Sequence, residues 1–165
     1  MGVLYIRKKL LIGISSILLI FWSRDCHIVE DYVSNKSMDM GIKLVIPSIQ
    51  FEKSLYDIDS ELNNVDYNVE VLKESSYGDK LFYIAGHSGN GDNCYFNKIR
   101  YLDVGEYIYI FVNDERLIYR VEDIYYIFKD GYMEIFVGEV NSIYLITCDI
   151  YNNSRQLVIK GVLVN

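Results

Sequence analysis

The hydrophobic positions of this chain fall in short runs, and most of these runs have the length of a β-strand. Val, Ile and Tyr dominate them, and branched or aromatic side chains fit a pleated, half-buried surface. The pattern predicts about eight strands, at residues 43–46, 69–72, 81–85, 107–112, 117–128, 133–137, 142–147 and 155–164. Apolar residues recur near helical spacing within residues 51–66, which predicts short helical turns there, and another turn is predicted at residues 96–102. Many short strands without a long helix predict a mainly β fold, a small closed β-barrel.

The last two runs form the clearest local pattern of the chain. Residues 143–147 and 157–164 flank a polar connection with two adjacent asparagines, which favours a turn, so we predict a β-hairpin. Gly161 predicts a bulge or bend in its second strand. Cys148 ends the first strand and Arg155 begins the second. Antiparallel pairing therefore brings a thiol and a guanidinium to one site.

His87 is the only histidine outside the N-terminal region, and it follows the strand at residues 81–85 in a glycine-rich loop. A thiol needs a base to act as a nucleophile, so one Cys, one His and one Arg at strand ends indicate thiol acyl transfer. Simpler interpretations exist for each residue alone. A cysteine at a strand end is often a small buried hydrophobe, and Arg155 could pair with a carboxylate such as Asp149.

The N-terminal region predicts a membrane anchor. A basic cluster precedes an uncharged run of thirteen residues, 10–22, which reaches about 20 Å against a hydrocarbon core of roughly 30 Å. Flanking basic side chains can snorkel and lengthen the span. We therefore expect residues 1–24 to form an uncleaved signal anchor, one transmembrane helix with the N-terminus inside, and a cleaved signal peptide is the alternative. Residues 25–41 are predicted to be a tether, and residues 42–165 the folded domain.

The charge and the cysteines narrow the function classes. Four of the 16 basic residues precede Asp25 and all 23 acidic residues lie from Asp25 onward, so that part of the chain has a net charge of −11. This acidity argues against nucleic acid as a partner. The cysteines, Cys26, Cys94 and Cys148, are too few for a disulfide scaffold.

No cofactor is expected from the sequence. Asp57, Asp59 and Glu61 alternate as calcium ligands sometimes do, but they lack the glycine turn and the EF-hand spacing, so the pattern favours a solvated face. His87 and Cys148 together cannot fill a zinc site.

The order of these features resembles the sortases, the cysteine transpeptidases of Gram-positive cell surfaces. The resemblance covers about residues 40–165, and its motifs are Val45-Ile46-Pro47, Ala85-Gly86-His87-Ser88, and Leu145-Ile146-Thr147-Cys148 with Arg155 seven positions later. Tyr144 stands where the family's Thr-Leu-x-Thr-Cys motif has its first Thr, so the subfamily stays open.

The resemblance implies a reaction and a role for each residue. Cys148 would attack a threonine-like carbonyl in an LPXTG-like sorting motif and form a thioester, which an amine then resolves. His87 would protonate the departing amine and deprotonate the incoming one, and Arg155 would stabilise the oxyanion or hold the substrate backbone. Thr147, next to Cys148, and Ser88, next to His87, are expected to bind the substrate.

The same resemblance implies the partners and the location. Surface proteins would supply the sorting motif, and a lipid-linked peptidoglycan precursor would supply the amine, on a domain that faces outward from the cell membrane. A pilin lysine is the alternative amine, although no long lid-like loop precedes the domain. Specificity is expected to lie around residues 127–142. A papain-like protease is disfavoured because its Cys precedes its His, and a non-catalytic, membrane-tethered β-barrel is the alternative from another class.

Overall fold

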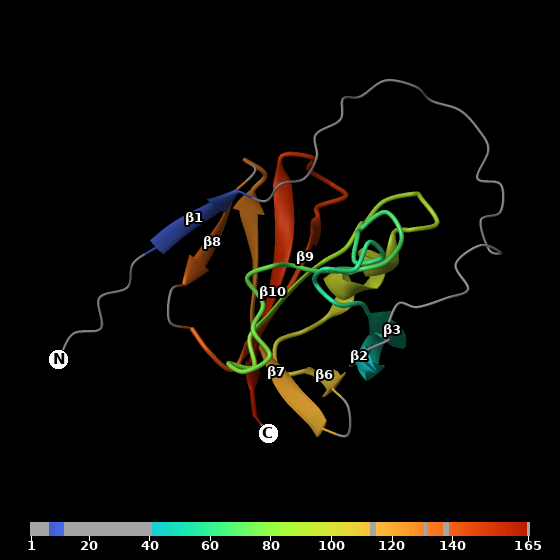
Figure 1. The fold of residues 1–165 in the computed structure, drawn as a ribbon. Coiled ribbons are helices and arrows are strands. Elements are labelled where there is room, and N and C mark those ends of the chain that lie inside the picture. The colour runs from blue at the N-terminus through green and yellow to red at the C-terminus, as the bar shows by residue number, and fades with distance from the viewer. Residues whose placement is uncertain (1–6, 12–40, 113–114, 131, 137–138, 165) are drawn as a thin grey trace.

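The computed structural model describes residues 7–11, 41–112, 115–130, 132–136 and 139–164 (Figure 1). The described residues form a mainly β fold, as predicted, with helical structure limited to short 3₁₀ turns. The elements in chain order are β1 (Arg7–Leu11), β2 (Ile42–Ile46), η1 (Pro47–Ile49), β3 (Phe51–Leu55), β4 (Glu70–Val71), β5 (Phe82–Ala85), η2 (Tyr95–Tyr101), β6 (Tyr107–Val112), β7 (Glu115–Phe128), β8 (Tyr132–Phe136), β9 (Ser142–Cys148) and β10 (Arg155–Leu163).

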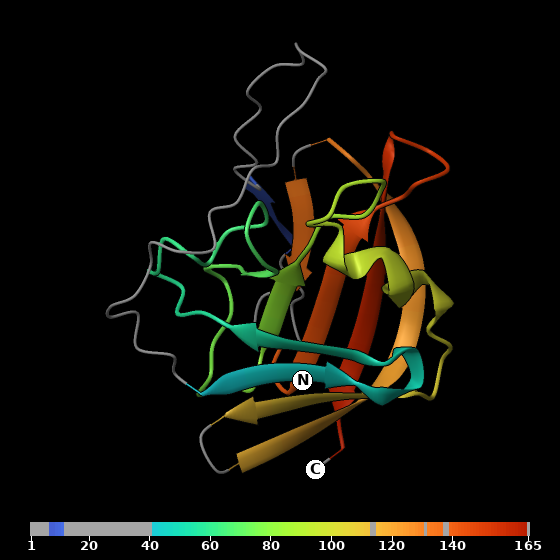
Figure 2. The same ribbon diagram turned by 90° about the vertical axis from the view of Figure 1, so that its right-hand side faces the viewer.

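Eight of these strands form one sheet in the order β3-β2-β6-β7-β10-β9-β5-β4. Figure 2 shows β2, β3 and β6 running across one end of the molecule, whereas β5, β9 and β10 stand side by side. The sheet keeps two edge strands, β3 and β4, so the barrel is nearly closed rather than closed as predicted. Asn68, just before β4, links the edges because its side-chain amide donates a hydrogen bond to the carbonyl of Ser54 in β3, at 2.7 Å.

The long strand β7 connects the part of the sheet that contains β6 with the part that contains β10. Its first half pairs with β6, and the same strand then pairs with β10 as far as Phe128, opposite Arg155. The register shifts between Lys160 and Gly161, which confirms the irregularity predicted at this glycine. A Cβ on Gly161 would lie 2.8 Å from the side chain of Ile143, its partner in β9, and 3.2 Å from Tyr119 in β7, so the neighbouring strands leave no room for a larger residue.

Alternation along β9 and its neighbours produces two apolar clusters. Ile143 and Leu145 point into the barrel, where the larger cluster draws on β2 to β7, β9 and β10. Tyr144 and Ile146 point to the other face and pack with Tyr83 of β5 in a smaller cluster. Because β9 is buried on both faces, it appears in the sequence as a continuous apolar run. Cys148 shares the alternation of Tyr144 and Ile146, so it belongs to the outer face.

Two predicted elements are wrong in detail. Residues 51–55, which were predicted to begin a helical segment, form β3 and pair with β2. Residues after β3 form turns, because Asp57 and Asn64 accept hydrogen bonds from backbone N–H groups two positions later, which competes with a helix. The strand predicted at residues 133–137 exists as β8, but it pairs with β1 in a separate two-stranded sheet. The eight-stranded sheet therefore contains β3 in place of β8.

The predicted anchor lies mostly outside the described residues. Its first two positions, Leu10 and Leu11, belong to β1 rather than to a helix, and residues 12–22 are not described. Among the described residues, no helix is long and apolar enough to cross a membrane.

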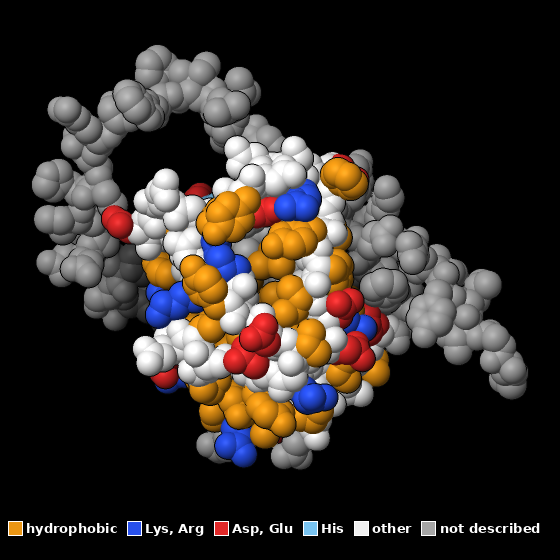
Figure 3. Space-filling model, turned by 180° about the vertical axis from the view of Figure 1, so that it is seen from behind, with side chains coloured by type: hydrophobic (Ala, Val, Ile, Leu, Met, Phe, Trp, Pro, Cys, Tyr) orange, Lys and Arg blue, Asp and Glu red, His pale blue; other side chains and the backbone are white. Residues whose placement is uncertain are grey.

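The outer surface mixes apolar and charged side chains. On β6 the rings of Tyr107, Tyr109 and Phe111 follow one another with centroids 6.5 Å apart, and the guanidinium of Arg116 lies 5.9 Å from the Tyr109 ring. Figure 3 shows hydrophobic side chains among basic and acidic ones on the face seen from behind. Arg116 of β7 therefore lies over the ring of Tyr109 of β6 on this surface.

Candidate active site

Parallel pairing of β5 and β9 brings His87 and Cys148 together. Ala85 is the register partner of Ile146, and the backbone N–H of Gly86 continues the ladder with a 3.0 Å hydrogen bond to the Ile146 carbonyl. His87 and Cys148 each lie two residues beyond that pair, so the backbone segments that carry them continue side by side, at the spacing of about 4.8 Å that neighbouring strands have. The sequence predicted both residues at strand ends but gave no information on this pairing.

Side-chain hydroxyls fasten the two strand ends to each other. Thr147 is buried, and its hydroxyl donates a hydrogen bond to the carbonyl of Gly86 at 2.7 Å. The hydroxyl of Ser88 donates to the carbonyl of Cys148. Both residues were predicted to bind substrate, and in this structure both hydroxyls donate to backbone carbonyls of the site. These two hydrogen bonds hold the backbone segments of His87 and Cys148 in register.

Close packing fixes the backbone immediately before the histidine. A Cβ on Gly86 would lie 2.8 Å from the ring of Phe96 in η2 and 3.1 Å from Val69. The backbone N–H of Phe96 also donates to the carbonyl of His87 at 2.9 Å. Only glycine fits this approach without displacing a buried aromatic ring. The glycine in the Ala-Gly-His-Ser motif thus has a packing role next to the functional residue.

The β9–β10 hairpin forms as predicted, and Arg155 begins its second strand. Cys148 pairs with Gln156, and the backbone N–H of Asp149 donates to the carbonyl of Arg155 at 3.0 Å. The guanidinium donates from Nε and Nη2 to Asp149 Oδ2, at 3.1 and 2.7 Å. It also lies 4.4 Å from the centre of the Tyr126 ring. The simpler interpretation, an Arg155–Asp149 ion pair, is therefore correct, and it leaves Nη1 able to donate to a substrate.

Asp149 is held as a carboxylate at the start of the hairpin connection. Its side chain is only 3% exposed, while that of Arg155 is 40% exposed. The hydrogen bond from the backbone N–H of Tyr151 is the main cause that lowers the pKa of Asp149; burial opposes it, and Arg155 adds to the lowering. A buried, charged Asp149 thus orients the partly exposed guanidinium of Arg155.

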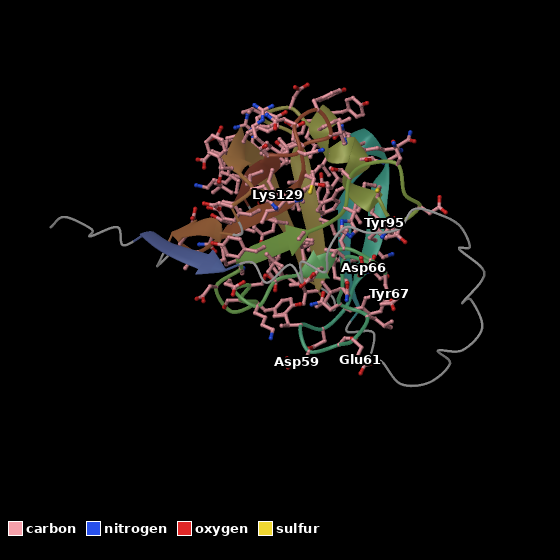
Figure 4. All side chains as sticks on the ribbon, turned by 90° about the horizontal axis from the view of Figure 1, so that it is seen from above. Asp59, Glu61, Asp66, Tyr67, Tyr95 and Lys129 are labelled. Atoms are coloured by element: carbon pink, nitrogen blue, oxygen red, sulfur yellow. The ribbon has the colours of Figure 1, made fainter. Side chains whose placement is uncertain are left out.

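His87 has a carboxylate partner that the sequence did not suggest. Its Nε2 lies 3.3 Å from Asp66 Oδ1, in the segment between β3 and β4. Figure 4 shows Asp66, Tyr67 and Tyr95 gathered on one side of this end of the barrel, with Lys129 on the other side. Asp66 is 70% exposed, so water screens the contact, which orients the ring more than it stabilises the fold.

Cys148 has a partner as well. Lys129, directly after β7, donates a hydrogen bond from Nζ to Cys148 Sγ at 3.4 Å. Among the described residues, His87, Cys148 and Arg155 are not hydrogen-bonded to one another; each is held by a different partner. Lys129 was missed because only the pairing of β7 with β10 brings it to the thiol, and no local pattern marks it.

Other predicted features lie apart from this arrangement. Cys94 is a free cysteine whose sulfur accepts a hydrogen bond from the N–H of Gly91 within the loop after His87. Asp59 donates its backbone N–H to Asp57, and both belong to the exposed turns after β3. Across the described residues, no three His, Cys, Asp or Glu side chains are grouped closely enough to hold a metal ion.

Comparison with known proteins places the chain in a family. The family model described as "Sortase domain" matches residues 44–164. The chain belongs to the sortase family. Sortases are a family of cysteine transpeptidases. The match runs from within β2 to the end of β10 and therefore contains all three residues, His87, Cys148 and Arg155, that the sequence singled out.

Individual sortases are distant relatives. Sortase A of Bacillus anthracis is 27% identical over 137 residues, which cover 80% of this chain and 65% of that protein, so the chain spans less than two thirds of its length. The crystal structure of sortase C1 from Streptococcus agalactiae is 23% identical with a TM-score of 0.63, over 78% of this chain and 69% of that one. Sortase C-1 from Actinomyces oris is 25% identical with a TM-score of 0.62, over 77% and 75%. Both sortase C structures thus share the fold of this chain.

Proposed function

We propose that this sortase cleaves an LPXTG-like sorting motif and transfers the acyl group to an amine through a thioester on Cys148. The observation that supports the proposal is the β5–β9 register, which sets the only described histidine beside a partly exposed thiol. Arg155 begins the adjacent strand. A nucleophile, a base and a cation therefore converge at one end of the barrel, which is the set that acyl transfer requires.

The steps follow from the chemistry of these groups. The Cys148 thiolate adds to the scissile carbonyl, and the developing oxyanion accepts hydrogen bonds from the free edge of the Arg155 guanidinium. The intermediate collapses as His87 protonates the departing amine, which leaves the acyl group as a thioester. An incoming amine then loses a proton to His87 and displaces the thiolate, so the enzyme returns to its starting state.

We propose the same cellular setting that the sequence predicted. The N-terminal region, residues 1–24, anchors the chain in the cell membrane, an arrangement in which Leu10 and Leu11 leave their pairing with β8. The catalytic domain lies outside the cell, and the amine belongs to a lipid-linked peptidoglycan precursor. The acidic folded domain supports a protein substrate rather than a nucleic acid. An acceptor assay tests the choice of amine: a cell-wall stem peptide should resolve the thioester faster than a lysine-containing pilin-like peptide, and the reverse order would indicate a pilin-polymerising sortase.

Intact-mass spectrometry of the full chain tests the reaction. Incubation with a mixture of sorting-motif peptides should add the mass of the N-terminal fragment of one peptide, and the same incubation of Cys148→Ala should add nothing. The added mass identifies the motif. A wild-type chain that gains no mass, and whose Cys148 also resists iodoacetamide, would contradict the proposal and favour a non-catalytic barrel.

The role of Arg155 has a matched control in the same chain. Arg155→Ala should lower kcat/KM by about 10²–10³, the usual cost of one oxyanion donor. Arg116→Ala removes another arginine that lies over a tyrosine ring, on β7, and should leave kcat/KM unchanged. Near-normal turnover of Arg155→Ala would exclude oxyanion stabilisation by this residue.

A further inference from the structure

Two hydrogen bonds, one from its backbone and one from its side chain, place Lys129 beside the proposed nucleophile. Its backbone N–H donates to the carbonyl of Ser154 at 2.8 Å, which fixes the end of β7 to the β9–β10 connection. Its side chain is exposed and crosses to Cys148, where Nζ lies 3.4 Å from Sγ. The position therefore brings a primary amine to the atom that carries the acyl group in the proposed reaction.

We propose that Lys129 is an internal acyl acceptor, modified when an acyl group on Cys148 is transferred to its ε-amine. This inference rests on the proposed thioester chemistry, but it concerns a modification site that the sortase reaction does not require. In a thioester the carbonyl carbon is bonded directly to Sγ. An amine in contact with Sγ is therefore close to the separation of about 3–3.5 Å from which addition to that carbon begins.

The transfer balances without any other reactant. The neutral ε-amine adds to the thioester carbon, the C–S bond breaks, and the electron pair leaves on the Cys148 sulfur. The proton lost by nitrogen goes to His87, as it does in the proposed reaction with an external amine. The products are an amide on Lys129 and a Cys148 thiolate, with the proton on His87, and an amide is far more stable than the thioester that precedes it.

The consequence is a competition between two amines. When an external acceptor is abundant, it resolves the thioester and Lys129 stays free. When the acceptor is scarce, the intramolecular amine, which has a high effective concentration, captures the acyl group. The acyl part of the substrate would then stay bonded to Lys129 through an isopeptide bond, and Cys148 would again be free of it.

A small acyl donor tests this transfer without relying on a sorting motif. The full chain is treated with p-nitrophenyl acetate, then with hydroxylamine, which removes thioesters and leaves amides, and acetyl-lysine is located by peptide mass spectrometry. Lys129 should be acetylated at least about tenfold more in the wild-type chain than in Cys148→Ala, because the thiol delivers the acyl group. Lys98, an exposed lysine of η2, is the internal control and should react equally in both proteins.

The outcomes separate this inference from the proposed function. Equal acetylation of Lys129 in both proteins, or an acetyl group found only as the hydroxylamine-labile adduct on Cys148, would overturn internal transfer and leave Lys129 as a charge beside the thiol. With sorting-motif peptides, Lys129→Arg should retain the labile thioester and lose the stable adduct. A failure of every peptide to acylate Cys148 bears on the proposed function alone, since the acetate experiment still decides the fate of Lys129.

Discussion

The buried hydroxyl of Thr147 offers the sharpest test of how the site is assembled. Thr147 is 3% exposed, and its hydroxyl donates to the carbonyl of Gly86 at 2.7 Å, between the strand that carries Cys148 and the segment that carries His87. Thr147→Val keeps the size and branching of the side chain and removes this hydrogen bond. The strand pairing stays, so the change loosens the junction without removing either functional residue.

The expected magnitude follows from the cost of a lost buried hydrogen bond. The bond itself contributes about 1 kcal/mol, and a buried acceptor left without a partner costs about 1–3 kcal/mol, so the free energy of unfolding should fall by roughly 1–3 kcal/mol. Because an error of about 1 Å in a reacting group can cost up to 10²-fold, kcat should fall by about tenfold or more. Urea unfolding and a peptide-cleavage assay measure the two effects.

Ser75 provides the control for a purely structural loss. Its hydroxyl accepts from the N–H of Tyr83 at 2.9 Å and donates to the carbonyl of the same residue at 3.2 Å, so it braces β5 away from the site. Ser75→Ala should lower stability to a similar extent and leave kcat unchanged. If Thr147→Val lost stability but kept normal kcat, or if Ser75→Ala lost as much activity, the reasoning that Thr147 positions the site would be wrong.

Two more changes test the neighbouring supports. Asp149→Asn should lower the free energy of unfolding at neutral pH, because a carboxylate whose folded-state pKa is lowered stabilises the fold above its unfolded pKa of about 4. The difference in free energy of unfolding between wild type and Asp149→Asn should therefore be constant between about pH 5 and 7 and should vanish as the pH falls below about 4. A difference that persists unchanged in acid would contradict an origin in the Asp149 charge. Gly86→Ala should cost about 1–3 kcal/mol in urea unfolding, because the added Cβ would meet the Phe96 ring at 2.8 Å. Gly78→Ala, where a Cβ meets nothing within 4 Å, is the matched control, and equal stability of the two variants would refute the packing argument.

Much of the site was predictable because its features are local. The hairpin between β9 and β10 follows from two apolar runs and a polar turn, so its two strands and the strand ends at Cys148 and Arg155 were predicted correctly. The glycine-rich loop after an apolar strand placed His87 at a strand end. The prediction of helical turns from residue 51 onward was wrong at residues 51–55. It rested on the near-helical spacing of apolar residues from Leu55 onward, whereas pairing with β2 makes Phe51 and Leu55 the two buried ends of a strand.

The tertiary structure alone decided which strand ends meet. His87 and Cys148 are brought together by parallel pairing across sixty residues of chain, and Lys129 and Asp66 reach them from segments with no distinguishing local pattern. Hydrophobic periodicity is set by residues two to four positions apart, so it records which face of a strand is buried. It carries no information on which strands pair, because that choice depends on burying all the apolar faces at once. The sequence therefore determined the candidate chemistry, and the sheet order determined its geometry and its partners.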